Sequence, residues 1–186
     1  MRPYRLVAGY TVALGLALGA QSCDDPVLPS PIFSNAVDTV SLAALDGTPV
    51  AARSAYDVAS KSTVRTDVTT AFDFVFNIDT LNRAVLIPAS AFHISGNSGL
   101  LRTTTAFADL RSAPNATYIA DSAVVVVPGD VLVVRSRVTN CVVGILPYYA
   151  KLGVIAVDAG ARRITFQILA NINCGYRSLE PGLPKQ

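Results

Sequence analysis

Few side chains in this sequence could do chemistry, and they lie far apart along the chain. His93, in the run A-F-H-I, is the only histidine. It could be a metal ligand or a general acid–base group, or it could be a strand-end histidine whose polar tip lies in water. Because no second ligand or nucleophile accompanies it, the second interpretation is favoured.

The acidic and aromatic residues give no catalytic pattern. Asp73, Asp79 and Asp109 could be general acids, but no paired-carboxylate motif marks them, and we expect them to face solvent on alternating strands. G-x-S-x-G, Walker, HExxH and EF-hand motifs are absent from the sequence. Tyr148 and Tyr149 are expected to place one ring in the core and one on the surface, where it could contact a ligand. The sequence therefore predicts a protein that is not an enzyme.

The first 22 residues have the features of a secretory signal peptide. M-R-P-Y-R is a positive segment, a 15-residue apolar segment follows, and small residues surround Cys23. The junction A-Q-S-C resembles the lipobox of bacterial lipoproteins, in which the cysteine is lipidated, although Ala20 stands where Leu is usual. The alternative is ordinary signal-peptidase cleavage near Ala20, with Cys23 left as a free thiol.

The cysteine count fits lipidation. Three cysteines are an odd number, and lipidation of Cys23 leaves Cys141 and Cys174 as a pair at the two ends of a hairpin. We expect these two to form a disulfide that closes a loop of about 34 residues. Two reduced buried thiols are the alternative.

Composition indicates where the domain lies and what it does not bind. Residues 23–35 hold three prolines after two acids and are expected to form a tether, residues 36–179 one domain, and residues 180–186 a flexible tail. Lys and Arg number 15 and Asp and Glu 13, and removal of a leader that holds Arg2 and Arg5 leaves 13 of each. This balance, with no basic cluster, argues against nucleic-acid binding. We expect a monomeric domain.

Period-two alternation predicts an all-β fold. In residues 163–173 the apolar side chains Ile164, Phe166, Ile168 and Ala170 share one face, and Leu169 is the exception. Residues 148–156 alternate in the same way, which places a hairpin loop at Asp158–Ala161. Further strands are expected at residues 37–45 and 50–58 (a hairpin about Asp46-Gly47), 71–78 (three phenylalanines on one face), 84–87, 118–127 (covered on both faces at Val124–Val127) and 131–138. Nine or ten short strands without an amphipathic helix indicate an antiparallel two-sheet β-sandwich or a flattened barrel.

From about Ala71 to Leu179 the chain resembles the HmuY-like envelope lipoproteins, a family of β-sandwiches known for haem capture. The resemblance rests on A-F-D-F-V-F-N, on H-I-S-G-N-S-G, and on G-D-V-L-V-V-R-S-R followed by Y-Y-A-K-L-G-V-I-A-V-D and R-I-T-F-Q-I. It implies haem as a possible ligand. The two His or Met axial ligands of that family are not matched, because His93 is the only histidine and Met1 the only methionine. A pair of His93 with Tyr118, Tyr148, Tyr149 or Tyr176 remains chemically possible.

Two functions stay open at this point. The first is a non-catalytic binding module for haem or another small hydrophobic ligand, held at the bacterial cell envelope by a lipid on Cys23, at the outer rather than the inner membrane. The second is an accessory lipoprotein that docks an envelope protein complex and binds no small molecule.

Overall fold

The computed structural model describes residues 28–94 and 96–185. The predicted leader, Cys23, the first residues of the tether and Gln186 lie outside this part of the chain. Within it, no helix is long and apolar enough to cross a membrane.

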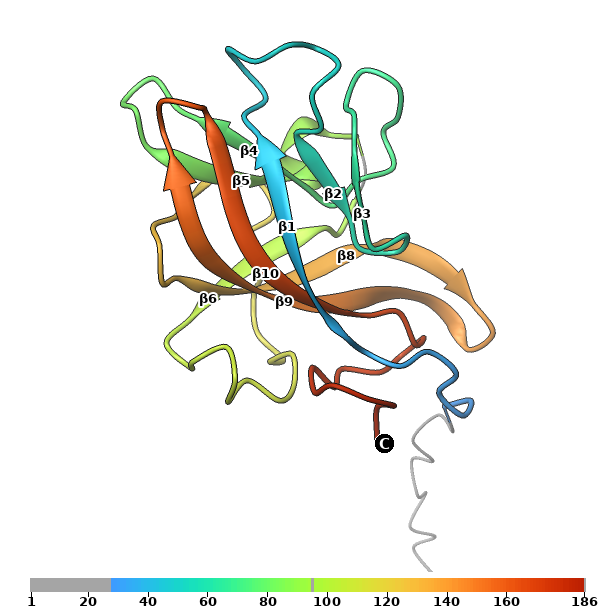
Figure 1. The fold of residues 1–186 in the computed structure, drawn as a ribbon. Helices are drawn as coiled ribbons and strands as arrows, with labels where there is room; N and C mark the ends of the chain where they lie inside the picture. Colours follow the sequence, from blue (N-terminus) through green and yellow to red (C-terminus); the bar gives the residue numbers. More distant parts are fainter. Residues whose placement is uncertain (1–27, 95, 186) are drawn as a thin grey trace, which may run out of the picture.

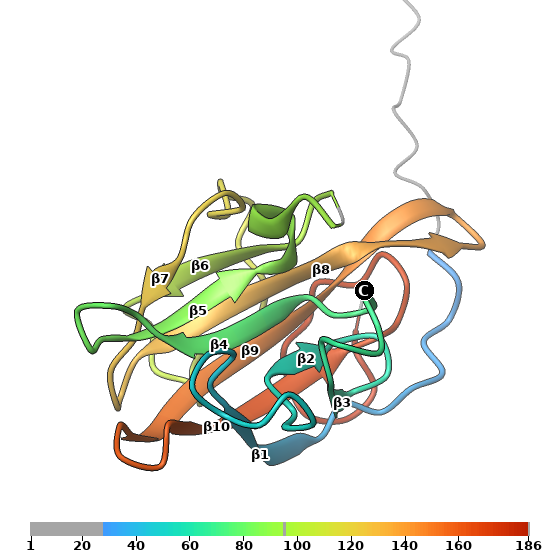
Figure 2. The same ribbon diagram turned by 90° about the horizontal axis from the view of Figure 1, so that it is seen from above.

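Two antiparallel sheets of five strands each form a sandwich (Figures 1 and 2). The first sheet has the order β1 (Val37–Ala43), β10 (Arg163–Asn171), β9 (Gly144–Asp158), β8 (Val131–Cys141) and β6 (Gly99–Thr103). The second has the order β3 (Ser62–Val64), β2 (Ala55–Asp57), β4 (Phe74–Ile78), β5 (Ala84–Pro88) and β7 (Val124–Val125). The helical element of the described residues is a short 3-10 turn, η1 (Ala89–Phe92). The predicted all-β sandwich is confirmed, and the sheets do not close into a barrel.

The main core lies between the sheets and contains the predicted aromatic residues. The rings of Tyr56, Phe74 and Phe166 contact one another at centroid distances of 5.7 to 6.1 Å. Each is at most 1% exposed. Because Phe74 is on β4 and Phe166 on β10, these contacts join the sheets, and the alternation within both strands is confirmed. Phe72, predicted to share the face of Phe74, precedes β4 and is instead buried in a separate cluster with Val75, so that part of the prediction is wrong.

A second apolar cluster covers the outer face of the first sheet. Leu169, the exception in the alternation of β10, is buried there with Val133, Leu110 and Leu179. The segment between β6 and β7 crosses this face and supplies Leu110. Leu169 is apolar on the outer face because a second layer covers that face, so both faces of β10 are covered there.

Two strand predictions are wrong. The expected hairpin of residues 37–58 does not form, because β1 pairs with β10 and β2 pairs with β3 and β4 in the other sheet. The Asp46-Gly47 turn therefore begins a crossover between sheets. In the run Val124–Val127 only two residues are strand, and Val127 is 56% exposed.

The residues assigned to a tether and a tail contact each other. Asn35 and Gly182 exchange backbone hydrogen bonds of 2.8 and 2.9 Å. The Asn35 side-chain amide also donates to the carbonyl of Glu180 at 3.1 Å. In the described part of the chain, both segments thus extend the domain beyond its predicted limits of 36 and 179.

Candidate functional site

The structure places His93 at the end of a turn, not of a strand. It follows η1 with φ of 57°, in the left-handed region, and its N–H donates to the Ser90 carbonyl at 3.0 Å. The residue is exposed. Neither of the two large cavities described below is lined by His93. The geometry therefore does not join His93 to a tyrosine as a ligand pair.

Tyr148 and Tyr149 lie on opposite faces of β9, and neither is simply a surface residue. Tyr149 is buried in the second cluster, its ring 6.2 Å from that of Tyr118. The Arg177 guanidinium lies 4.6 Å from the Tyr149 ring centroid and donates to its hydroxyl at 3.3 Å. Tyr148 is half-buried and packs against the main core. The expectation of one free outer ring is corrected, because a second layer covers this sheet.

Tyr148 lines a cavity of about 330 Å³ at one end of the sandwich, which we call the apolar cleft. Three segments form its walls: residues 29–33, the tip of the β8–β9 hairpin, and the chain after β10. Its lining residues are Pro29, Ser30, Pro31, Ile32, Phe33, Asn140, Cys141, Val142, Tyr148, Ile172, Asn173, Cys174 and Tyr176. A mainly apolar lining with a few amide and hydroxyl groups is the usual composition of a small-molecule site.

A disulfide fixes two walls of the apolar cleft. Cys141, the last residue of β8, is bonded to Cys174 across a Cα–Cα distance of 6.0 Å. The expected pairing is thus confirmed. It ties the hairpin tip to the segment after β10, so the two walls cannot separate without reduction.

Asn173 fixes the third wall. Its buried side-chain oxygen accepts the N–H groups of Ile32 and Phe33, both at 2.9 Å, and its amide donates to the Phe33 carbonyl at 2.7 Å. The Tyr176 hydroxyl donates to the Pro29 carbonyl at 3.0 Å. These bonds satisfy backbone groups of a proline-rich segment that has no sheet partner, and hold it against the domain.

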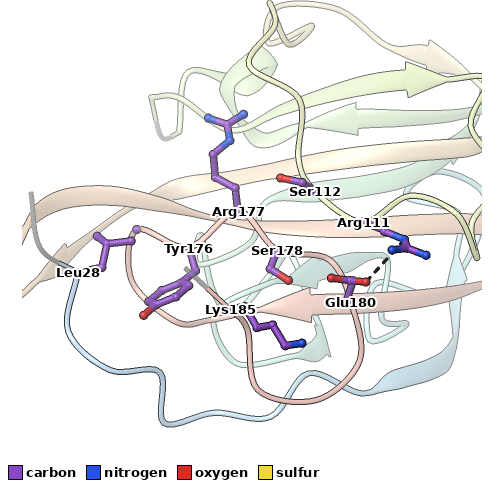
Figure 3. Close-up of a pocket in the computed structure, with 9 residues that line it drawn as sticks. Leu28, Arg111, Ser112, Tyr176, Arg177, Ser178, Glu180 and Lys185 are labelled. Carbon is purple, nitrogen blue, oxygen red and sulfur yellow. Dashed lines mark ion pairs between the residues drawn. The ribbon is translucent and has the colours of Figure 1, made fainter. Parts of the chain in front are cut away.

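A second cavity of about 390 Å³, which we call the polar cavity, shares Tyr176 with the apolar cleft as a lining residue (Figure 3). Its ionisable lining residues are Arg111, Arg177, Glu180 and Lys185, three basic and one acidic. Arg111 and Glu180 form an exposed ion pair of 3.7 Å, and Arg177 points away from them. Arg177 donates to the Ala113 carbonyl at 2.9 Å and also to that of Pro114. Arg111 and Lys185 are therefore the cations that face solvent here.

Sequence reasoning missed a charged cluster between the sheets. Asp73, expected to face solvent, is 0% exposed, and its two oxygens accept the N–H groups of Val58 and Arg137, each at 2.7 Å. The Arg137 guanidinium donates to Asp57 at 2.9 Å and lies 3.5 Å from Asp73. Burial raises the pKa of Asp73 to about 6, against the opposing effect of Arg137. With both its oxygens bound to backbone, Asp73 joins the sheets and is not placed to meet a ligand.

Lys151 is a second buried charge that the alternation of β9 did not predict. It is 3% exposed, and its ammonium donates to the carbonyls of Phe107 and Leu110 at 2.8 and 3.0 Å. Burial lowers its pKa. The segment that covers the first sheet is thus fixed by this lysine.

No group of three or more His, Cys, Asp or Glu side chains that could hold a metal ion occurs among the described residues. No model of a known protein family matches the chain, and no curated protein matches it.

Proposed function

We propose that this protein is a lipid-anchored binding module of the bacterial cell envelope that holds a small apolar molecule in the apolar cleft. The cleft is the observation that carries the proposal. Its volume of about 330 Å³ lies in the range of small-ligand sites, and a disulfide and buried hydrogen bonds hold its walls in place. A site that is formed before binding does not spend binding free energy on ordering its walls.

Three observations support the envelope location. The leader and A-Q-S-C junction are those of an exported chain, and disulfides persist in oxidising compartments. The Cys141–Cys174 bond accounts for two of three cysteines, so Cys23 is the one left for a lipid. We place the lipid on Cys23, with the outer membrane favoured.

The ligand of this proposal is apolar and needs no metal. The cleft offers the Tyr148 ring, the Tyr176 hydroxyl and the amides of Asn140 and Asn173. Because Asn173 and Tyr176 are already bound to residues 29–33, little polar capacity remains for a charged group. Haem coordinated by His93 does not fit this arrangement.

Binding can be tested with the neutral fluorescent probe N-phenyl-1-naphthylamine, whose emission rises in apolar surroundings. We expect saturable binding of one probe per chain. Ile172→Trp should fill the apolar cleft and weaken binding at least tenfold. Ile155→Trp is the matched control, because Ile155 is 49% exposed on β9 and does not line the cleft. Equal binding by both variants, with unchanged melting temperatures, would remove the cleft as the site.

The anchor has a separate test. The mass of the chain purified from membranes should include a lipid on Cys23, and Cys23→Ser should release the protein to the soluble fraction. A lipid-free mass with normal probe binding would refute the anchor and leave the binding module.

A further inference from the structure

The apolar cleft, the polar cavity and the first described residue lie at the same end of the molecule, which we call the anchor end. A Cβ atom placed on Gly175 would lie 2.5 Å from the Leu28 side chain and 3.5 Å from that of Leu146, at the start of β9. Figures 1 and 2 show the start of the described chain beside the tip of the β8–β9 hairpin. Any anchor attached before Leu28 therefore acts on this end.

The reach of the preceding chain is short. Cys23 is five residues before Leu28. Five residues span about 18 Å at most when fully extended. A lipid on Cys23 would thus keep the anchor end within about 18 Å of the membrane surface, a distance shorter than the long strands β8, β9 and β10, which at about 3.4 Å per residue each span about 30 Å or more.

The hairpin tip at this end is uncharged and exposes large apolar side chains. Residues 138–147 read V-T-N-C-V-V-G-I-L-P and contain no ionisable group apart from the disulfide-bonded Cys141. Val142 is 95% exposed and Ile145 66% exposed, and Ile32, on the neighbouring cleft wall, is 76% exposed. Single exposed apolar residues are common, but three at one end of a domain are a surface that water solvates poorly.

The opposite end of the same strands has a different character. There β9 and β10 are joined through D-A-G-A-R-R, a turn with three ionisable residues. Exposed apolar side chains occur in other loops too, at Val50 (74% exposed), Leu81 (69%) and Val127 (56%), but each of those loops contains Asp or Arg side chains. What distinguishes the β8–β9 tip is a run of ten residues without a charged side chain.

Basic side chains lie in the polar cavity at the same anchor end. Arg111 and Lys185 face solvent in the polar cavity, which has two more basic than acidic residues. Leu28 lines this cavity too. Apolar side chains that reach the acyl boundary, with cations beside them at the level of the phosphates, are the arrangement of a protein surface that lies on a bilayer.

We propose that the β8–β9 tip and Ile32 contact the bilayer surface, with Arg111 and Lys185 at the phosphates, so that the apolar cleft opens at the lipid. This rests on the lipid anchor of the proposed function. It also defines the ligand class: an apolar molecule that partitions into the membrane and enters the cleft from it.

Tryptophan fluorescence tests the contact directly, because the chain contains no tryptophan. Val142→Trp places the only indole at the tip, and Ile145→Trp, outside the cleft lining, is a second reporter. Val127→Trp is the matched control, since Val127 is 56% exposed and precedes β8 at the end opposite the tip. Each processed full chain is placed on vesicles of phosphatidylcholine and phosphatidylglycerol with brominated acyl chains. A chain that carries no natural lipid is instead coupled to a maleimide lipid through the Cys23 thiol.

We expect the emission of both tip variants to move to shorter wavelength on vesicles, with at least half of it quenched by bromine. The emission intensity of Val127→Trp should change by less than a tenth. If the emission wavelength and bromine quenching of the tip variants matched those of Val127→Trp, the proposal would be overturned, and the result would point to a protein partner for the tip. Because the maleimide lipid supplies an anchor in any case, a missing natural lipid refutes only the anchor, whereas unquenched tips refute only the contact.

Discussion

At the scale of single residues, Asp73 makes the clearest prediction. Its two oxygens accept two backbone N–H groups and face Arg137, whereas an asparagine has one acceptor and would turn its amide toward an N–H. Asp73→Asn should lower the free energy of unfolding by about 3 kcal/mol at pH 7, the cost of breaking a buried pair. Asp121→Asn, at an exposed carboxylate, should have almost no effect. Urea unfolding measures both.

The same residue gives a pH dependence. Burial raises the pKa of Asp73 from 3.8 to about 6, so between these values the folded state binds a proton that the unfolded state releases. The stabilising contribution of protonated Asp73 is complete below pH 3.8 and is lost as the pH rises through 6. The difference in the free energy of unfolding between the wild type and Asp73→Asn should therefore decrease as the pH rises across this window, by up to about 1.4 kcal/mol per pH unit. A difference that rises with pH would contradict the assignment.

His93 should prove dispensable for any haem interaction. It is exposed at the end of a 3-10 turn and lines neither large cavity. In a haemin titration followed at the Soret band, His93→Ala should give the same absorbance change as the wild type. A saturable one-to-one shift that weakens in His93→Ala would restore haem as the ligand.

Alternation in the sequence predicted the faces of β4 and β10, but not the burial of Asp73 and Lys151. A period of two reports which side chains share a face, and says nothing of what covers the other face. Here the opposite face of the first sheet is covered by the segment between β6 and β7, which has no periodic pattern. Asp73 accepts from Arg137, 64 residues away, and Lys151 donates to Phe107, 44 residues away, so no local signal could reveal these contacts.

At the scale of elements, the disulfide determines how firmly the apolar cleft is held. Replacing Cys141 and Cys174 together by alanine frees a loop with a sequence separation of 33 residues. The chain-entropy relation gives a loss of about 3–4 kcal/mol in the free energy of unfolding. We also expect weaker binding of N-phenyl-1-naphthylamine, because two walls of the cleft are no longer joined. Cys23→Ser is the control and should leave stability unchanged. An equally stable double variant would show that packing alone holds the tip.

Local turn chemistry was a poor guide to strand pairing at the start of the domain. Asp46-Gly47 is a favourable hairpin turn, and Gly47 does adopt a positive φ of 72°. Yet β1 pairs with β10, whose partner residues lie 120 to 132 positions later, and the chain then crosses to the other sheet. The hairpin about Asp158–Ala161 was predicted because its two strands, β9 and β10, are adjacent in sequence. The apolar cleft could not be predicted, since Asn173 joins it to residues about 140 positions away.

At the scale of the whole molecule, the β8–β9 tip has no charged side chain whereas the β9–β10 turn at the other end has three, a difference that the proposed anchor on Cys23 would explain. Without the predicted leader the sequence has no net charge to hold it on a membrane, so we expect the contact of the hairpin tip to depend on the short distance between Cys23 and Leu28. Twenty Gly/Ser residues inserted between Asp25 and Pro26 would add a flexible segment with a root-mean-square length of about 25 Å. The longer tether lowers the local concentration of the hairpin tip at the membrane surface. Bromine quenching of Val142→Trp should therefore decrease, while the protein still floats with the vesicles. The same insert placed after Gln186 should leave quenching unchanged. Undiminished quenching with the longer tether would mean that the tip binds the bilayer without help from the anchor.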